Sequence, residues 1–214
     1  MLLVDNSLSP HGGILVERVS YPGKAAKSIS GLPHLAISDQ IAHECVDIAY
    51  GFFSPLEGFM GEKDLDSVAT SMTLASGYVW TIPVICDISS QKLAELNVSQ
   101  GDSLLLTSED QPLAVLEIQE IYSYDKELLA QQIYGTTDGA HPGVSRTNAY
   151  QDLFVAGPIT LVNPPIINPP FDRFWHTPKQ LRQSFEEKGW GKAVAHQSRN
   201  VPHSGLSLIH ISEP

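Results

Sequence analysis

Two proline pairs divide this chain into a long first part and a short second part. They occur in Asn163-Pro164-Pro165 and in Asn168-Pro169-Pro170. Proline lacks a backbone N–H and restricts the residue before it, so regular helix or strand pairing cannot continue through both pairs. We therefore expect a domain boundary here, with one domain over residues 1–168 and the start of a second over residues 169–204.

The first part begins with helical patterning. Ser38 is a typical helix N-cap, and Gly51 is placed to end the helix that follows it. The apolar residues between them share one helical face: Ile41, Cys45, Ile48 and Ala49. A second short helix is predicted from the spacing of Leu65, Val68 and Met72. A short strand is expected before both helices, over Ile14–Val19.

Strand-like patterning dominates after these helices. Short β-rich runs lie at Val79–Ile88, Ser103–Thr107, Leu113–Ile121 and Leu153–Val162. In the third run, Ala114, Leu116 and Ile118 alternate with Glu117 and Gln119, as in a half-buried strand. Helices followed by many short strands predict an α+β domain with a small barrel or curled sheet.

The second part predicts a helix and then a strand. Thr177 is a suitable cap, Pro178 suits the first helical position, and Gln180 completes a capping box. Leu181 and Phe185 would form the buried stripe of this helix, which Gly189 would end. The apolar run Ala193–Ala195 is typical of a buried strand in a parallel sheet.

A dense group of polar side chains follows that run: Gln197, Ser198, Arg199, Asn200 and His203. In open α/β sheets, ligands bind beyond the carboxyl ends of the strands. Arg199 can hold an oxyanion through two parallel hydrogen bonds, with Gln197 and Asn200 as neutral donors. His203 could donate to a phosphate, particularly at a helix N-terminus. The same residues also fit a solvated loop that only caps secondary structure.

Charge and hydropathy weigh against several classes of function. The formal net charge of −11 opposes nucleic-acid binding, which relies on Lys and Arg displacing counterions. The chain has no apolar run long enough for a membrane span and no basic, apolar start typical of a secretory signal. We therefore expect a cytoplasmic protein without a membrane partner, in which Cys45 and Cys86 are buried thiols.

The segment Gln197–His203 resembles the ATP sulfurylase signature Gln-(Thr/Ser)-Arg-Asn-(Pro/Val)-x-His of the HxGH nucleotidyltransferase superfamily. Four further segments are similar to that family, in its order and roughly its spacing: Pro10–Gly13, Gly51–Met60, Trp80–Val84 and Gly135–Val144. Five collinear segments are far more specific than one HxGH-like fragment. The resemblance covers the chain up to about Ser204.

This resemblance implies a PUA-like N-terminal domain followed by the start of a Rossmann-like α/β nucleotidyltransferase domain. It implies that sulfate contacts Gln197 and Arg199, and that ATP contacts Gln197, Asn200 and His203. Ser198, Arg199, Asn200 and His203 would be the catalytic residues of a sulfate adenylyltransferase, which converts ATP and sulfate to adenylyl sulfate and pyrophosphate. Mg²⁺ would accompany ATP, and the full-length protein could be a homo-oligomer.

The resemblance fails at the end of the chain. Leu206 stands where the family has its second motif histidine, and residues 205–214 do not resemble the family. We expect these residues to be a non-native tail on a fragment that is inactive alone. An α/β domain cut short leaves apolar surface uncovered, so Leu181, Phe185 and Val194 should be poorly buried.

Other interpretations remain open at this stage. The motif also fits another HxGH-type adenylyltransferase acting on a phosphorylated acceptor, and a PUA-like domain alone could bind RNA. The turn His11-Gly12-Gly13 could approach an active site or could simply need positive φ. Asp138 and His141 resemble a charge-relay pair, but their neighbours favour turn stabilisation. The remaining histidines lack metal-ligand spacing: His34, His43 and His176.

Overall fold

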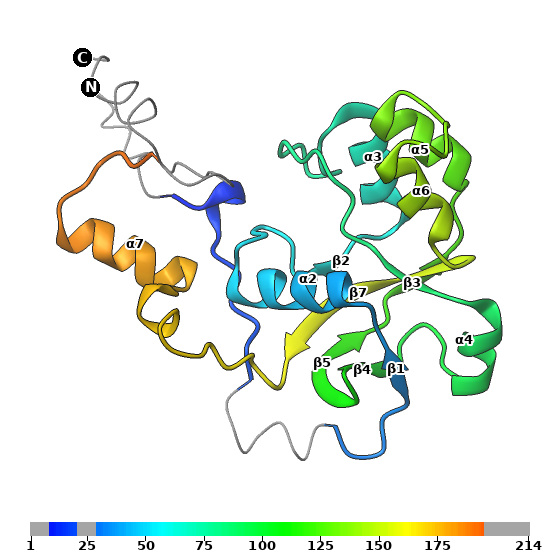
Figure 1. The fold of residues 1–214 in the computed structure, drawn as a ribbon, viewed down its shortest axis with the longest axis horizontal. Helices are drawn as coiled ribbons and strands as arrows, with labels where there is room; N and C mark the ends of the chain where they lie inside the picture. Colours follow the sequence, from blue (N-terminus) through cyan, green and yellow to red (C-terminus); the bar gives the residue numbers. More distant parts are fainter. Residues whose placement is uncertain (1–8, 21–28, 195–214) are drawn as a thin grey trace. The chain divides into compact units, whose positions relative to one another are not determined.

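The computed structural model describes residues 9–20 and 29–194, and Figure 1 shows the path of the chain. The residues divide into two compact units. The larger unit comprises Ser9–Leu181, and the described part of the smaller unit is 182–194. The five loop residues predicted to bind substrate lie outside the described residues.

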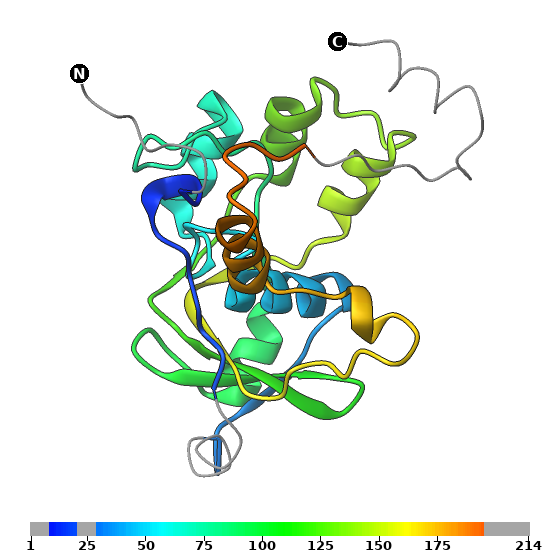
Figure 2. The same ribbon diagram turned by 90° about the vertical axis from the view of Figure 1, so that its left-hand side faces the viewer.

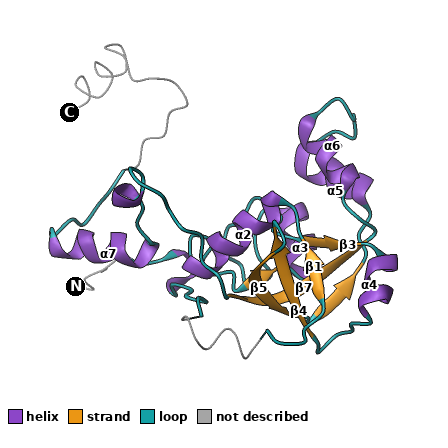
Figure 3. Cartoon of the chain, turned by 60° about the horizontal axis from the view of Figure 1, so that its bottom comes forward, coloured by secondary structure: helices purple, strands orange, loops and turns teal. Residues whose placement is uncertain are grey.

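The larger unit is built on a curled mixed sheet of seven strands, drawn in orange in Figure 3. The strands are β1 (His34–Ala36), β2 (Gly58–Phe59), β3 (Cys86–Ile88), β4 (Ser103–Ser108), β5 (Gln111–Glu117), β6 (Glu120–Tyr122) and β7 (Leu153–Leu161). β7 pairs antiparallel with β2, β3, β5 and β6, whereas β1 pairs parallel with β4. The expected α+β domain with a curled sheet is confirmed.

The curl of the sheet is centred on β7. Its first half pairs with β3 and β6, while its second half pairs with β5. Gly157 lies between the two halves with φ of 143°, a value that L side chains rarely adopt. A residue without a Cβ atom therefore lets one long strand serve both parts of the sheet.

The helices and turns are η1 (His11–Gly13), α2 (Asp39–Tyr50), α3 (Glu62–Ser71), α4 (Ser90–Leu96), α5 (Lys126–Tyr134), α6 (Pro142–Ala149), η2 (Asp172–Phe174) and α7 (Pro178–Glu187). α2 confirms its sequence prediction. The Ser38 hydroxyl accepts the Ile41 N–H at 3.3 Å, and Gly51 ends the helix in the left-handed conformation. The predicted apolar face of α2 is buried and packs toward β7 (Figure 1).

Three predicted element boundaries were wrong. Ile14–Val19 forms only an isolated bridge at Val19, because Val16 and Arg18 donate their backbone N–H groups to the Ser54 hydroxyl and the Ala49 carbonyl. Met72 lies just beyond α3, in the left-handed conformation, and is exposed. The run Val79–Ile88 pairs as a strand only from Cys86 onward, after the interruption at Pro83.

The other strand predictions fit the structure closely. Ala114, Leu116 and Ile118 are buried, while Glu117 and Gln119 are exposed, as the alternation predicted. The run Leu113–Ile121 is divided between β5 and β6. Cys45 and Cys86 are fully buried free thiols in the same hydrophobic core as these strands.

The proline pairs lie in a segment without helix or strand, over residues 162–171. The expected domain boundary at residue 168 stays a prediction, and the compact units divide later, within α7. The capping box of that helix is confirmed. Gln180 donates its N–H to the Thr177 hydroxyl at 3.2 Å, and its side-chain oxygen accepts the Thr177 N–H at 2.9 Å.

The stripe predicted on α7 is not buried. No residue of this helix is buried, and Leu181 is 44% exposed. Phe185 is partly exposed and stacks on Trp190, with 5.7 Å between the ring centroids. Ala193 and Val194 form no strand, and Val194 is 98% exposed. The predicted strand was therefore wrong at its two described residues, whereas the expected poor burial is confirmed.

Candidate functional site

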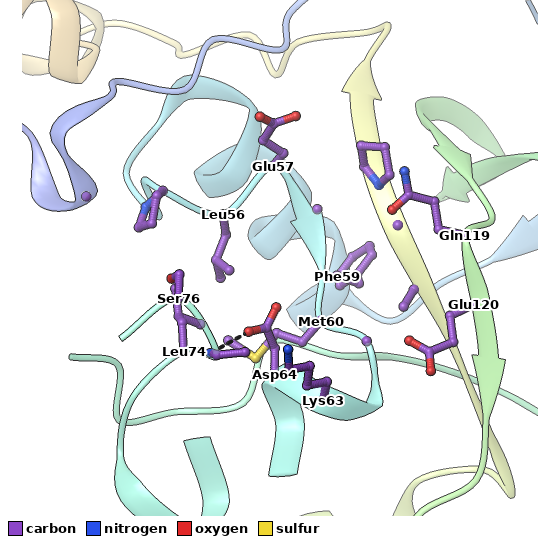
Figure 4. A pocket seen from close by; sticks show the side chains of 18 of the residues that line it. Leu56, Glu57, Phe59, Met60, Lys63, Asp64, Leu74, Ser76, Gln119 and Glu120 are labelled. Atoms are coloured by element: carbon purple, nitrogen blue, oxygen red, sulfur yellow. Dashed lines mark hydrogen bonds between the residues drawn. The ribbon is translucent and has the colours of Figure 1, made fainter. Parts of the chain in front are cut away.

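A cleft of the larger unit has a volume of about 750 Å³ and lies beside β2, shown in Figure 4. One wall comes from the chain around Leu56 and Glu57, which leads into β2. A second comes from the loop at Leu74–Ser76, and a third from Gln119 and Glu120 near the crossing of β2 and β7. The cleft is therefore built from segments far apart in the sequence.

Carboxylates dominate the charge of this cleft. Glu57, Asp64 and Glu120 line it, with Lys63 as the lysine among the lining residues. A surplus of negative charge repels sulfate and triphosphate, so this cleft does not suit an anionic substrate.

Each of these carboxylates already has a structural partner. Asp64 accepts the Ala75 N–H at 2.8 Å, the dashed contact in Figure 4. Glu120 accepts the Glu62 N–H at 3.1 Å, at the start of α3. Glu57 pairs with the Arg18 guanidinium at 3.0 Å. The cleft carboxylates therefore connect loops and helix ends, and they form no free acid–base pair.

Glycines permit the close backbone approach at the base of the cleft. A Cβ atom on Gly58 would overlap the carbonyl group of Gly157, because β2 and β7 cross there. A Cβ atom on Gly61 would overlap the Glu120 carboxylate. Packing of two backbones within the fold explains Gly58, whereas the flexible Glu120 side chain could move away from a Cβ atom on Gly61.

The turn His11–Gly13 is fixed to neighbouring loops. Gly12 and Gly13 have φ of 77° and 80°, and a Cβ atom on Gly12 would collide with the ring of Pro55. His11 donates from Nε2 to the Val79 carbonyl oxygen at 2.8 Å. The glycines are thus required by conformation and packing. Whether the turn approaches an active site stays a prediction.

The Asp138 and His141 pair stabilises a turn, as their neighbours predicted. Asp138 accepts the Ala140 N–H at 2.9 Å, and His141 Nδ1 accepts the Gly143 N–H at 3.2 Å at the start of α6. Each side chain thus accepts a hydrogen bond from the turn's own backbone. The observed contacts are those of a helix cap.

The candidate metal residues do not converge. Within residues 9–20 and 29–194, no group of three His, Cys, Asp or Glu side chains could hold a metal ion. Among these same residues, no helix is long and apolar enough to cross a bilayer.

Sequence analysis missed one unusual group, the carboxyl of Glu44 on α2. Burial raises its pKa to about 7, assisted by the charge of Asp47, while Gln40 and Arg146 oppose the rise. Gln40 donates to Oε1 at 2.9 Å, whereas Oε2 is buried without a hydrogen-bond partner. The sequence signal was a carboxylate beside the buried Cys45, but neighbouring helix positions do not reveal burial of one oxygen.

Comparison with known proteins gives the class first. The family model described as "PUA-like domain" matches residues 8–164, which include the whole curled sheet. A second model, described as "ATP-sulfurylase", matches residues 172–212, which include the polar loop at residues 197–203. The chain belongs to the PUA-like domain family through its first part, and its second part is similar to ATP-sulfurylase.

Several relatives named "Sulfate adenylyltransferase" are similar to nearly the whole chain. The protein of Staphylothermus marinus is 42% identical over 94% of this chain and 52% of its own length. That of Cenarchaeum symbiosum is 40% identical over 96% of this chain and 52% of its own. The protein of Hyperthermus butylicus is 38% identical over 94% of this chain and 51% of its own length. The chain thus spans about half the length of these relatives.

A solved structure supports the fold alone. The chain titled "Hexameric APS kinase from Thiobacillus denitrificans" superposes with a TM-score of 0.62 at 24% identity. The match covers 86% of this chain and 32% of that one.

Proposed function

We propose that this chain supplies the PUA-like domain and the substrate-binding loop of a sulfate adenylyltransferase. The observation that supports this proposal is the 38–42% identity with three proteins of that name over at least 94% of the chain. The ATP-sulfurylase match also includes every residue that we expect to bind substrate. In the reaction, a sulfate oxygen attacks the α-phosphorus of ATP, and the bond to pyrophosphate breaks.

The loop residues suit this chemistry. Arg199 and Gln197 would hold sulfate, while Asn200, His203 and Gln197 would contact the phosphates of ATP. Ser198 would complete the catalytic loop with Arg199, Asn200 and His203. Sulfate is already deprotonated at neutral pH, so the attack needs no general base. The main task is to hold two mutually repelling anions in line and to stabilise charge in the transition state.

The described residues support placing the substrates at this loop. The 750 Å³ cleft is lined mainly by carboxylates and disfavours anions, so it does not compete as a site for sulfate or ATP. Mg²⁺ would arrive bound to the ATP phosphates. We further propose a cytoplasmic enzyme, which can form homo-oligomers when full length.

A joined protein tests the function. It consists of residues 1–203 of this chain followed by the aligned continuation of the Staphylothermus marinus relative. We expect sulfate-dependent exchange between ATP and pyrophosphate from the joined protein, and none from the 214-residue chain alone. Exchange that needs a phosphorylated acceptor in place of sulfate would instead indicate another HxGH-type adenylyltransferase.

Two substitutions assign the exchange to this loop. Arg199→Ala and His203→Ala should each lower the exchange rate by about 100-fold or more, the cost of losing one transition-state donor. Arg173→Ala and His176→Ala are matched controls, because both side chains are exposed and lie before α7. Equal rates in the loop variants and the controls would contradict the proposed site.

A further inference from the structure

Among the stretches of the larger unit without Asp, Glu, Lys or Arg are residues 9–16, 48–56 and 67–86. Charged residues make up 17% of the chain, and acidic residues outnumber basic ones by 24 to 13. The longest of the three, residues 67–86, is largely irregular and surface-exposed between Met72 and Pro83, where a solvated loop would ordinarily carry charge.

The three uncharged stretches meet in space. His11 donates to the Val79 carbonyl and lies between two aromatic rings, at 5.8 Å from Tyr78 and 6.4 Å from Trp80. Phe53 packs edge-on against Trp80, with 5.8 Å between the ring centroids. Figure 2 shows η1 beside the loop that follows α3. Segments distant in sequence thus form one connected region.

Large apolar side chains project from this region into solvent. Their exposed fractions are 69% for Ile14, 62% for Met72, 43% for Tyr78 and 65% for Val79. We call these four residues the uncharged face. Single exposed apolar residues are ordinary, but a contiguous group marks an interaction surface. Aromatic residues and Met are enriched, and charges depleted, at the centres of protein interfaces.

Two donor groups of Trp80 next to the face already have acceptors. The Trp80 indole N–H donates to the Ile82 carbonyl at 2.6 Å, and the Trp80 backbone N–H donates to the Met72 carbonyl at 2.8 Å. A partner that covers the face therefore does not need to supply acceptors for Trp80. Burial of the side chains of the face would remove apolar surface from water.

We propose that the uncharged face is the docking surface for the further half of a sulfate adenylyltransferase, the part of the relatives that this chain does not match. This inference rests on the proposed function. The relatives are about twice as long as the matched region, so a large second surface is available to cover this one. The chemistry expected of the covering surface is apolar and uncharged.

Hydroxyl-radical footprinting tests the docking directly. Met72 and Tyr78 report on the uncharged face, and Tyr134 on α5 is a matched control with 37% of its side chain exposed. Labelling of Met72 and Tyr78 should fall about fivefold or more from the 214-residue chain to the joined protein, as expected for burial in an inter-domain interface. Labelling of Tyr134 should change little. Equal labelling of Tyr78 in both proteins would overturn the proposal.

The same experiment identifies a competing occupant. If the 214-residue chain alone shows protection of Tyr78 that grows with protein concentration, a second copy covers the face and the proposal is wrong. Exchange activity is measured on the same joined protein. Protection of Tyr78 without ATP–pyrophosphate exchange would support the docking surface and reject the proposed function. Exchange without protection of Tyr78 would support the proposed function and reject the docking surface.

A charged substitution gives a second measurement that does not depend on labelling. Val79→Lys should leave the unfolding midpoint of the 214-residue chain unchanged, because the side chain already faces water. In the joined protein it should lower the midpoint by about 4 °C or more, because a charge would be buried. Leu128→Lys, exposed on α5, is the control. No difference between Val79→Lys and this control would contradict the docking.

Discussion

The hydrogen bond from Nε2 of His11 to the carbonyl oxygen of Val79 joins two segments 68 residues apart. It fixes the η1 turn to the loop between α3 and β3, within the charge-free region of the surface. His11→Ala should loosen both segments while lowering the free energy of unfolding by only about 1 kcal/mol, the usual net value of one hydrogen bond. Hydrogen exchange should rise near His11 and Val79.

His34→Ala is the control for that substitution, because His34 is also exposed but lies in β1. It should leave exchange near Val79 unchanged. If His11→Ala and His34→Ala have the same effect on those amides, the bond does not hold the two segments together.

Ser54 is expected to be a sensitive buried position. Its hydroxyl accepts the Val16 N–H at 3.0 Å and donates to the Gly51 carbonyl at 2.8 Å. Ser54→Ala leaves a buried donor and acceptor unpaired, so it should lower the free energy of unfolding by about 1–3 kcal/mol in urea titrations. Ser71→Ala removes an exposed helical contact and should cost clearly less. Similar losses at both positions would argue against the Ser54 interpretation.

The crossing of β2 and β7 should tolerate no side chain at Gly58. A Cβ atom there would overlap the Gly157 carbonyl, and neither backbone can move without breaking strand pairing. Gly58→Ala should lower the free energy of unfolding by about 3 kcal/mol. Gly139→Ala is the control, because a Cβ atom there meets nothing within 4 Å. A fully stable Gly58→Ala protein would show that the strands do not approach this closely.

Glu44 should make stability fall as pH rises toward neutral. Its pKa is about 7 in the folded chain, above the ordinary value of 4.5. Between pH 4.5 and pH 7, Glu44 is ionised in the unfolded chain but still protonated in the folded chain. Its contribution to stability is therefore complete below about pH 4.5 and is lost progressively up to about pH 7. Glu44→Gln keeps a neutral side chain, so it should stabilise the protein above pH 7 by about 3 kcal/mol at most and change little at pH 4.5.

Glu95→Gln provides a matched control on α4. Glu95 accepts the same type of bond, from Gln91 at 2.9 Å, but its side chain is exposed and its pKa is lowered by hydrogen bonds from Gln91 and Lys92 and by the Lys92 charge. The Glu95→Gln variant should therefore show no gain in stability at high pH. A pH-independent effect of Glu44→Gln in thermal melts from pH 4.5 to 8 would contradict a raised pKa at Glu44.

Local sequence patterns predicted elements whose stability is local. The capping residues Ser38 and Thr177, together with Gly51 and Gly189, were predicted correctly because a cap depends on a few neighbouring backbone groups. The alternation around Leu116 was equally informative, because period-two patterning directly reports one buried face. The predictions failed at Ile14–Val19 and over most of Val79–Ile88. Pairing there depends on which distant groups accept the backbone hydrogen bonds.

The sequence by itself indicated an α+β domain, the capped helices that begin after Ser38 and Thr177, and a motif at residues 197–203 that resembles a nucleotidyltransferase signature, because motif identity and local capping need no distant contacts. Only the tertiary structure decided that β7 serves both parts of the sheet, that one oxygen of Glu44 is buried without a partner, and that three charge-free stretches meet at one surface. Each of these depends on contacts between residues far apart in the chain, and no local propensity encodes such a contact.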